Sequence, residues 1–165
     1  MLKVPYFNNI EVETSDTENI DEKNAITALD NFLALTEANR IADSYHVFAY
    51  YKDFHEDVGG EDWLDEEMGI PESPTDIWKY VKPNRMICIE KGYDGDDNWY
   101  ITMEANCDWE EEHGLMLVWR NGTTLTKVGG YDGHLTNVNA FADDNMINVV
   151  YAASNPEYKT FLNSN

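Results

Sequence analysis

The sequence predicts an α+β fold, in which an antiparallel β-meander of five or six strands carries N-terminal helices packed on one face. Apolar residues recur at helical spacing between residues 19 and 82, whereas residues 85–152 hold short apolar or alternating runs separated by turn residues. The Asn121-Gly122 pair is typical of a two-residue hairpin turn. With 165 residues, the chain suits one domain, 1–165, that is large enough to bury a core.

The N-terminal half is expected to begin with an edge strand at Tyr6–Glu13, where Ile10 and Val12 alternate with polar residues. The first helix should start near Asn19, because Glu22 follows three residues later as in a capping pair. Its apolar positions fall near helical spacing, at Ile26, Leu29, Leu33 and Ala38.

Two more helices are expected before the sheet. One covers Ser44–Glu56 and ends at Gly59-Gly60, since glycine readily adopts the left-handed conformation that ends helices. The other starts at Ser73, with Pro74 at its first helical position, and must be short because Pro83 follows. Together these helices supply a cover for the apolar face of the sheet.

The second half is expected to supply the strands of the meander. Residues Trp99–Trp109 alternate without a break between apolar and polar side chains, which is a strong strand signal. The other strands should lie at Met86–Ile89, Leu115–Arg120, Thr123–Val128 and Met146–Ala152. Pro156–Leu162 is expected to form a terminal helical turn.

The two cysteines, Cys88 and Cys107, are expected to remain free thiols. A hairpin between residues 85–90 and 99–109 places Cys88 opposite about Ile101, far from Cys107. Free thiols fit a reducing compartment, and the sequence shows neither a signal peptide nor a run of roughly 18 apolar residues. We therefore expect a cytoplasmic protein that does not associate with membranes.

The chain is strongly acidic, with thirty-two Asp and Glu against eleven Lys and Arg and a formal net charge of −21 at pH 7. Such a charge repels nucleic acid and anionic membranes, and it attracts cations and basic proteins. The imbalance is concentrated in residues 53–78, which contain ten carboxylates and neither lysine nor arginine.

Within this stretch, Trp63 stands among acidic residues, as in a surface that docks a basic partner. The charges would steer the encounter, and the indole would supply a buried anchor. The candidate partner-binding residues are Asp62, Trp63, Asp65, Glu66 and Glu67. Alternatively, the segment is a short helix that Trp63, Leu64 and Met68 hold against the core while its acids face water.

Residues 107–115 read Cys-Asp-Trp-Glu-Glu-Glu-His-Gly-Leu and precede the Asn121-Gly122 pair. This segment resembles a family of small uncharacterised bacterial proteins with a Cys-x-Trp-x-x-Glu-His-Gly-Leu signature ahead of a hairpin. The opening Pro5-Tyr6-Phe7 is also similar, and the similarity is strongest over residues 75–135. Since some members resemble immunity or interaction proteins, the resemblance implies a bacterial protein of that kind and no particular reaction.

Two interpretations of the motif residues Trp109, Glu112, His113 and Gly114 stay open. In one they form a structural turn, with Gly114 supplying an unusual backbone dihedral and His113 hydrogen-bonding the backbone. In the other, Glu112 and His113, within the run Glu110-Glu111-Glu112-His113 and together with Asp108, bind a divalent metal, since carboxylates and imidazoles are good ligands. The fold would then have to bring in a second histidine, such as His134.

The sequence contains no phosphate loop, dinucleotide fingerprint, nucleophile elbow or zinc-protease motif, so we expect no cofactor and no catalytic residue. The favoured function is a non-enzymatic, immunity-like binding protein of the cytosol that docks a basic protein, such as a toxin, through its acidic surface. The alternative is a divalent-metal-binding protein or metal-dependent enzyme that uses the turn at Glu112 and His113.

Overall fold

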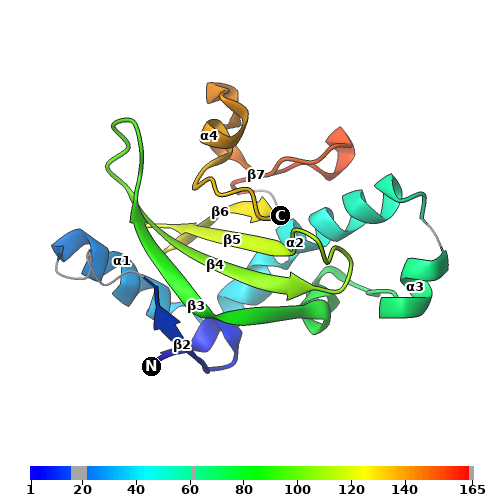
Figure 1. Cartoon of the computed structure of the whole chain (residues 1–165), viewed down its shortest axis with the longest axis horizontal. Coiled ribbons are helices and arrows are strands. Elements are labelled where there is room, and N and C mark those ends of the chain that lie inside the picture. Colours follow the sequence, from blue (N-terminus) through cyan, green and yellow to red (C-terminus); the bar gives the residue numbers. More distant parts are fainter. Residues whose placement is uncertain (16–21, 61, 164–165) are drawn as a thin grey trace.

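The structure is a computed structural model that describes residues 1–15, 22–60 and 62–163. In these residues an open eight-stranded sheet has the order β1-β2-β3-β4-β5-β6-β7-β8, so strands that follow one another in sequence lie side by side (Figure 1). The strands are β1 (Leu2–Val4), β2 (Ile10–Thr14), β3 (Val81–Lys91), β4 (Trp99–Cys107), β5 (Leu115–Arg120), β6 (Thr124–Gly129), β7 (Val149–Tyr151) and β8 (Thr160–Phe161).

The described helices are of two kinds. The α-helices are α1 (Lys23–Ala34), α2 (Glu37–Asp57), α3 (Asp62–Met68) and α4 (Asn137–Phe141). The short 3-10 helices are η1 (Pro5–Phe7), η2 (Pro74–Tyr80), η3 (Asp144–Asn148) and η4 (Pro156–Tyr158). None of the helices in the described ranges is long and apolar enough to cross a membrane.

The fold is α+β as predicted, but the predicted strand count and the uniformly antiparallel meander are wrong. Short strands from both ends of the chain extend the sheet beyond five or six members, and β2–β3 and β6–β7 are parallel pairs. Both parallel pairs follow from connectivity, because helical segments separate their members in sequence and bring the chain back to the end at which the earlier strand began. The antiparallel pairs β3–β4, β4–β5 and β5–β6 form the continuous centre.

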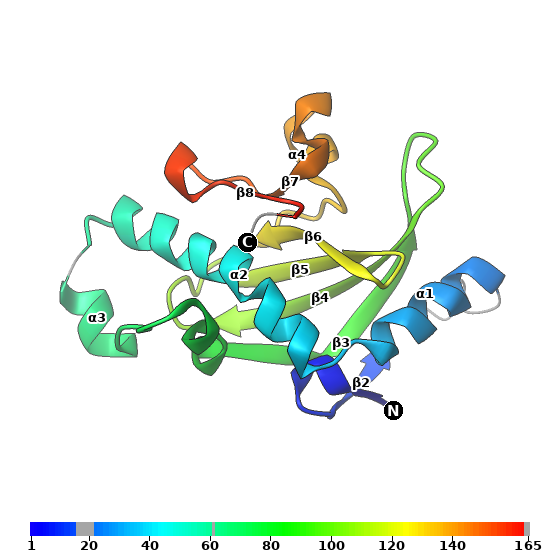
Figure 2. The same cartoon turned by 180° about the vertical axis from the view of Figure 1, so that it is seen from behind.

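The sequence predicted that the N-terminal helices all pack on one face of the sheet, but not all of them do. Figure 2 shows α1 and α2 in front of one face of the sheet, whereas α3 lies beyond its edge.

The helices also begin at other residues than predicted. Helix α2 begins at Glu37, before the predicted Ser44, because Thr36 and Asn39 form a capping box that adds a polar first turn. Helix α1 begins at Lys23, and the expected cap at Asn19 lies outside the described residues.

Three boundaries at the ends of the chain also differ from prediction. The strand expected at Tyr6–Glu13 starts only at Ile10, because Pro5 opens a 3-10 helix and Asn8 and Asn9 adopt positive φ. The last long strand shrinks to β7, since η3 occupies the residues before it. Of the helical turn expected at Pro156–Leu162, only η4 (Pro156–Tyr158) is helical, and Thr160–Phe161 forms strand β8 instead.

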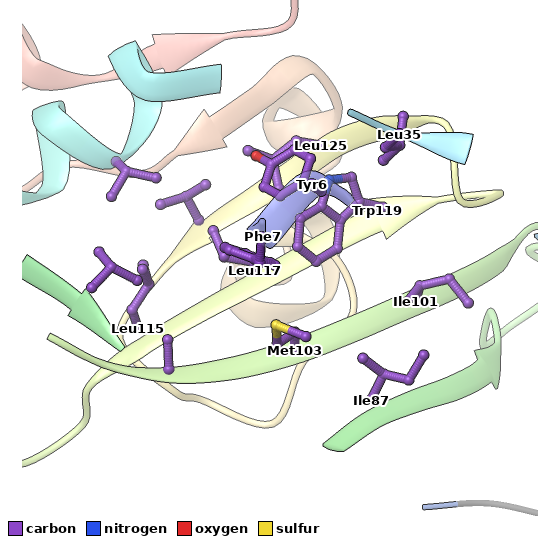
Figure 3. Close-up of a cluster of buried hydrophobic side chains, with 14 of the residues drawn as sticks. Tyr6, Phe7, Leu35, Ile87, Ile101, Met103, Leu115, Leu117, Trp119 and Leu125 are labelled. Carbon is purple, nitrogen blue, oxygen red and sulfur yellow. The ribbon is translucent and has the colours of Figure 1, made fainter. Parts of the chain in front are cut away.

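The main core lies between α1, α2 and the inward face of the central strands (Figure 3). Trp119 of β5 is fully buried there, with ring centroids 5.3 Å from Tyr6, 6.4 Å from Phe7 and 4.9 Å from Phe32. These edge-on and tilted aromatic contacts join η1 and α1 to the sheet. The N-terminus and the first helix are thereby fixed to the same tryptophan.

The opposite face of the sheet is not simply solvated. Tyr100, Met116 and Val118 are buried there in a second apolar cluster with Leu135 from the loop after β6. The same loop is anchored by Lys127, which is 2% exposed and lies 2.6 Å from Asp132 through its Nζ and Oδ1 atoms. The strict inside–outside alternation predicted for β4 therefore fails at Tyr100, because a loop covers that part of its outer face.

The turn between β5 and β6 matches the prediction from Asn121-Gly122, since both residues have positive φ, 51° and 69°. Thr123 closes the turn by donating its N–H to Arg120 O at 3.1 Å. The turn packs on α1, where a Cβ added to Gly122 would overlap the carbonyl oxygen of Ala28. Glycine is therefore required there both by backbone conformation and by space.

We predict that Gly122→Ala destabilises the protein by roughly 3 kcal/mol or more, because it adds overlap with α1 to the strain of a left-handed residue. Gly95→Ala is the matched control, since Gly95 has φ +88° and nothing within 4 Å of its added Cβ. It should lose only about 1–2 kcal/mol. Urea unfolding of both variants measures the difference, and equal losses would contradict the close approach of the turn to α1.

Candidate functional site

Helix α3 carries the acidic candidate residues and is held by two contacts. Leu64 is 1% exposed and belongs to the main core. Asp65 faces His55 of α2, with 2.9 Å between Oδ1 and Nε2, and this contact is only partly exposed. Asp65 therefore positions the helix, whereas the sequence had placed it with the partner-binding residues.

The remaining candidates form one exposed surface. Trp63 is 47% exposed, and the acidic side chains of Asp62, Glu66 and Glu67 around it are also exposed. We call these four residues the α3 surface. Of the three residues that could have held the helix against the core, Leu64 and Met68 pack on it and Trp63 does not. Helix α3 stands at the end of the molecule in Figure 1.

The base-free stretch at residues 53–78 does not form a single acidic patch. Asp53 is 1% exposed and accepts hydrogen bonds from Tyr151 Oη at 2.7 Å, Ser154 N at 2.8 Å and Asn155 N at 2.9 Å. Asp76 pairs with Lys79 at 2.6 Å. Asp53 and Asp76 thus hold the fold or are neutralised locally. Among the other acids of the stretch, Asp62, Glu66 and Glu67 are exposed on α3, and Glu56, Asp57 and Glu72 are exposed elsewhere.

The turn between β4 and β5 is organised by Glu110, which the sequence analysis grouped with the candidate metal ligands and to which it gave no structural role. Its carboxylate is 9% exposed and accepts the N–H groups of Glu112 and His113, each at 2.9 Å, through its two oxygens. Tyr50 Oη donates to the same carboxylate at 3.3 Å and to Gly114 O at 3.1 Å. One signal in the sequence could have identified Glu110. A carboxylate at the start of a turn can accept the backbone N–H groups two and three residues later, as in an Asx-type turn.

The four motif residues of this turn differ in their surroundings. Trp109 is 2% exposed, and its ring lies edge-on to Tyr50 at 5.6 Å. Gly114 has φ +62°, and a Cβ there would lie 2.7 Å from Ala105 O. Glu112 and His113 are exposed, and His113 O accepts the N–H of Tyr131 at 3.0 Å. Trp109 and Gly114 are thus enclosed by neighbouring groups of the fold, whereas Glu112 and His113 present their side chains to solvent.

A cation could be held at the exposed side of this turn. Ligand atoms of Glu110, Glu112 and His113 all lie within 4.8 Å of one another. Among these atoms, His113 Nδ1 lies 3.3 Å from Glu110 Oε2. The predicted pair Glu112 and His113 is thus brought together, while His134 is not part of this group. Glu110 is already engaged by three donors, so a cation would have to share its oxygens with them.

A cysteine nucleophile is not supported at the turn. Cys107 is buried and donates through Sγ to Glu110 O at 3.3 Å. Burial raises the pKa of the Cys107 thiol to about 12, so thiolate is scarce at neutral pH. Both Cys88 and Cys107 are free thiols, and Cys88 lies opposite Thr102, one residue from the predicted Ile101.

Sequence reasoning also missed a cleft of about 650 Å³ on the outer face of the sheet. It lies between the loop that joins β3 to β4 and the segment that contains α4 and η3, and Tyr100 and Arg120 reach it from the central strands. No local motif could have revealed it, because its walls come from segments far apart in the sequence.

We predict that Glu110→Ala destabilises the protein by about 2 kcal/mol, since it leaves two turn N–H groups and the Tyr50 hydroxyl without the carboxylate. His113→Ala should change the free energy of unfolding by no more than about 0.5 kcal/mol, because its side chain is 59% exposed. Denaturant unfolding compares the two variants. A neutral Glu110→Ala beside a damaging His113→Ala would reverse the assignment of the structural residue.

Comparison with known proteins places the chain in a family. Residues 1–135 match the family model described as a domain of unknown function (DUF6985). The match contains α3 and the β4–β5 turn, and it extends to residue 1, well before the segment in which the sequence similarity was expected to be strongest. Comparisons with curated proteins and with solved structures found no match. The chain therefore belongs to the DUF6985 family of domains, an uncharacterised family as its sequence had indicated.

Proposed function

We propose that this protein is a non-enzymatic, immunity-like binding protein that docks a basic protein partner through the α3 surface. The observation that carries the proposal is the exposure of Trp63, 47%, in the midst of Asp62, Glu66 and Glu67. Large aromatic side chains are usually buried, and an exposed one surrounded by charge has the composition of an interface anchor with a polar rim.

The electrostatics of the whole chain favour the same kind of partner. A net charge of −21 attracts a basic protein over a distance of about a Debye length, roughly 8–10 Å at physiological salt, and repels nucleic acid and anionic membranes. The three exposed acids of the α3 surface would then orient the encounter around Trp63. A basic toxin whose active site is covered in this way would be inhibited without any chemistry by this chain.

The support of α3 favours a preformed docking surface. Leu64 is buried and Asp65 contacts His55, so the short helix is held from its inner side. A surface that is already ordered loses less conformational entropy on binding than a mobile segment does. The proposed partner would meet the protein in a reducing cytosol, with which the two free thiols are compatible.

We predict that replacing Asp62, Glu66 and Glu67 together by lysine slows association with a basic partner by about 10-fold or more at low salt. Trp63→Ala should weaken the complex by about 2 kcal/mol, mainly through faster dissociation. The partner is first captured from native lysate at low salt on immobilised wild-type protein. It is then purified, and its binding kinetics are measured over a range of ionic strength.

The matched control replaces Glu11, Glu13 and Glu104 by lysine, because these exposed acids lie on the sheet and their reversal changes the net charge by the same amount. The control should retain the partner. An association rate that ignores ionic strength, or equal losses in the two triple variants, would rule out docking through the α3 surface.

A divalent-cation site at the β4–β5 turn is the second candidate, because Glu110, Glu112 and His113 place their ligand atoms within 4.8 Å of one another. A cation there would be held by one imidazole nitrogen and carboxylate oxygens, a mixed ligand set that suits Zn²⁺ or Mn²⁺. This candidate includes a metal-dependent enzyme, with solvent able to reach the exposed side chains of Glu112 and His113.

For this second candidate, Zn²⁺ or Mn²⁺ at 100 times its dissociation constant should stabilise the wild-type protein by about 2.7 kcal/mol. His113→Ala should abolish that gain, whereas His134→Ala, which removes an exposed histidine outside the group, should keep it. Thermal unfolding with and without each ion, together with metal analysis of untagged protein, measures the effect. A gain that persists in His113→Ala, or no gain with either ion, would refute the site.

A further inference from the structure

The outer cleft has a volume of about 650 Å³, within the range of roughly 300–1,000 Å³ typical of small-molecule sites. Its floor is the outer face of β4, β5 and β6, which presents Tyr100, Arg120 and Thr126. The β3–β4 loop and helix α4 both rise from the sheet above this floor in the view of Figure 1. The cleft is separate from α3 and from the β4–β5 turn.

Arg120 is the unusual group in this cleft. The protein has three arginines, of which Arg40 pairs with Glu37 at 3.0 Å and Arg85 is exposed. Arg120 is only partly exposed, and its guanidinium has no hydrogen bond or ion pair within residues 1–15, 22–60 and 62–163. A guanidinium presents five donors in a planar fork, so this one is free to receive a planar anion such as a carboxylate.

The carboxylate of Asp96 lines the same cleft and does not neutralise Arg120 by direct contact. Its Oδ2 atom accepts the hydroxyl of Tyr100 at 2.6 Å. Its Oδ1 atom accepts the N–H and the side-chain amide of Asn98, at 3.0 Å and 2.6 Å. Because both of its oxygens accept hydrogen bonds from Tyr100 and Asn98, Asp96 does not bond to the guanidinium of Arg120. It does add negative charge beside that group.

The rim of the cleft supplies opposite charge and an apolar wall. Asp94 on the β3–β4 loop and Asp144 on η3 are exposed carboxylates at the edges. Met146, Ile147 and Val149 line one side, and Ile147 is 64% exposed despite its size. A ligand that is only anionic would meet one cation and three carboxylates, whereas one that also carries an amine would match both charges.

We propose that the cleft binds a small zwitterion of the amino-acid class, with its carboxylate on Arg120, its ammonium group toward the rim carboxylates and its apolar side chain against Met146 and Ile147. The inference is independent of the α3 surface, because no residue is shared between the two sites. Convergence of a few polar groups with an apolar wall is the arrangement expected of a small-molecule site.

Three probes with one apolar body test the assignment of charges: L-phenylalanine, 3-phenylpropionate, which lacks the amine, and phenethylamine, which lacks the carboxylate. Calorimetric titration should give the tightest binding for L-phenylalanine, with a dissociation constant of about 1 mM or below. Each deleted charge should weaken binding by about 10-fold or more. Perturbation of the amide resonances of Asn98 and Asn137 in nuclear magnetic resonance spectra would locate the ligand in the cleft.

Arg120→Gln should weaken L-phenylalanine binding by about 10- to 100-fold and leave phenethylamine binding unchanged. Arg85→Gln is the matched control and should bind like wild type. Ile147→Ser alters an exposed wall residue without touching the core or adding a charge, so it keeps the test valid if Arg120→Gln fails to fold, and it should weaken all three probes. Phenethylamine binding as tight as that of L-phenylalanine, no binding of any probe, or full binding by Arg120→Gln would overturn the proposal.

Discussion

The structure depends on the way in which helix α2 crosses the inner face of the sheet with polar groups on its buried side. Tyr50 donates to Gly114 O and Glu110, and Asp53 accepts three hydrogen bonds from Tyr151, Ser154 and Asn155.

His46 of the same helix is also buried. Its Nδ1 atom lies 2.7 Å from the hydroxyl of the fully buried Thr160, and burial lowers the pKa of His46 to about 4, so the ring is neutral at pH 7. Since buried polar groups are costly unless paired, these contacts fix the position of α2 along its axis as well as its depth. The β4–β5 turn and the C-terminal strands are placed by the same helix.

This constraint also divides the carboxylates into two populations. Asp43 accepts a hydrogen bond from the buried Tyr6 hydroxyl at 2.9 Å, and burial raises the pKa of Asp43 to about 6. Like Asp53 and Glu110, it is an internal acceptor, so its contribution to a negative surface is small. The exposed acids that remain are distributed over the surface, and only on α3 do they surround a large exposed indole. Net charge alone therefore indicated the class of partner, while burial decides which of the acids could meet it.

The central hairpins could be predicted from sequence because their signals are local. Alternation over Trp99–Trp109 and the Asn121-Gly122 pair are both read within a few residues, and the turn geometry follows from positive φ that Asn and Gly tolerate. The short outer strands could not be predicted, since three residues of β1 or β7 become a strand only when a neighbour pairs with them. The structural role of Glu110 was missed for a related reason: the sequence indicated Glu110 only as one of a run of candidate metal ligands, whereas its carboxylate acts within the fold through a contact with Tyr50, sixty residues earlier. Arg120 carries no local signal at all.

The extent of the family match bears on where the two proposed sites belong. The α3 surface, the β4–β5 turn and Arg120 all lie within residues 1–135, the segment that matches the DUF6985 model. The apolar wall of the outer cleft, with Met146 and Ile147, lies after it. The later segment is nevertheless built into the fold, because Thr160 lies 2.7 Å from His46 and Tyr151 donates to Asp53 at 2.7 Å. The cleft therefore joins charged groups of the matched segment, Arg120 and Asp94, to an apolar wall from residues beyond it. The charge of its ligand should depend on the former and the fit of the ligand's apolar part on the latter.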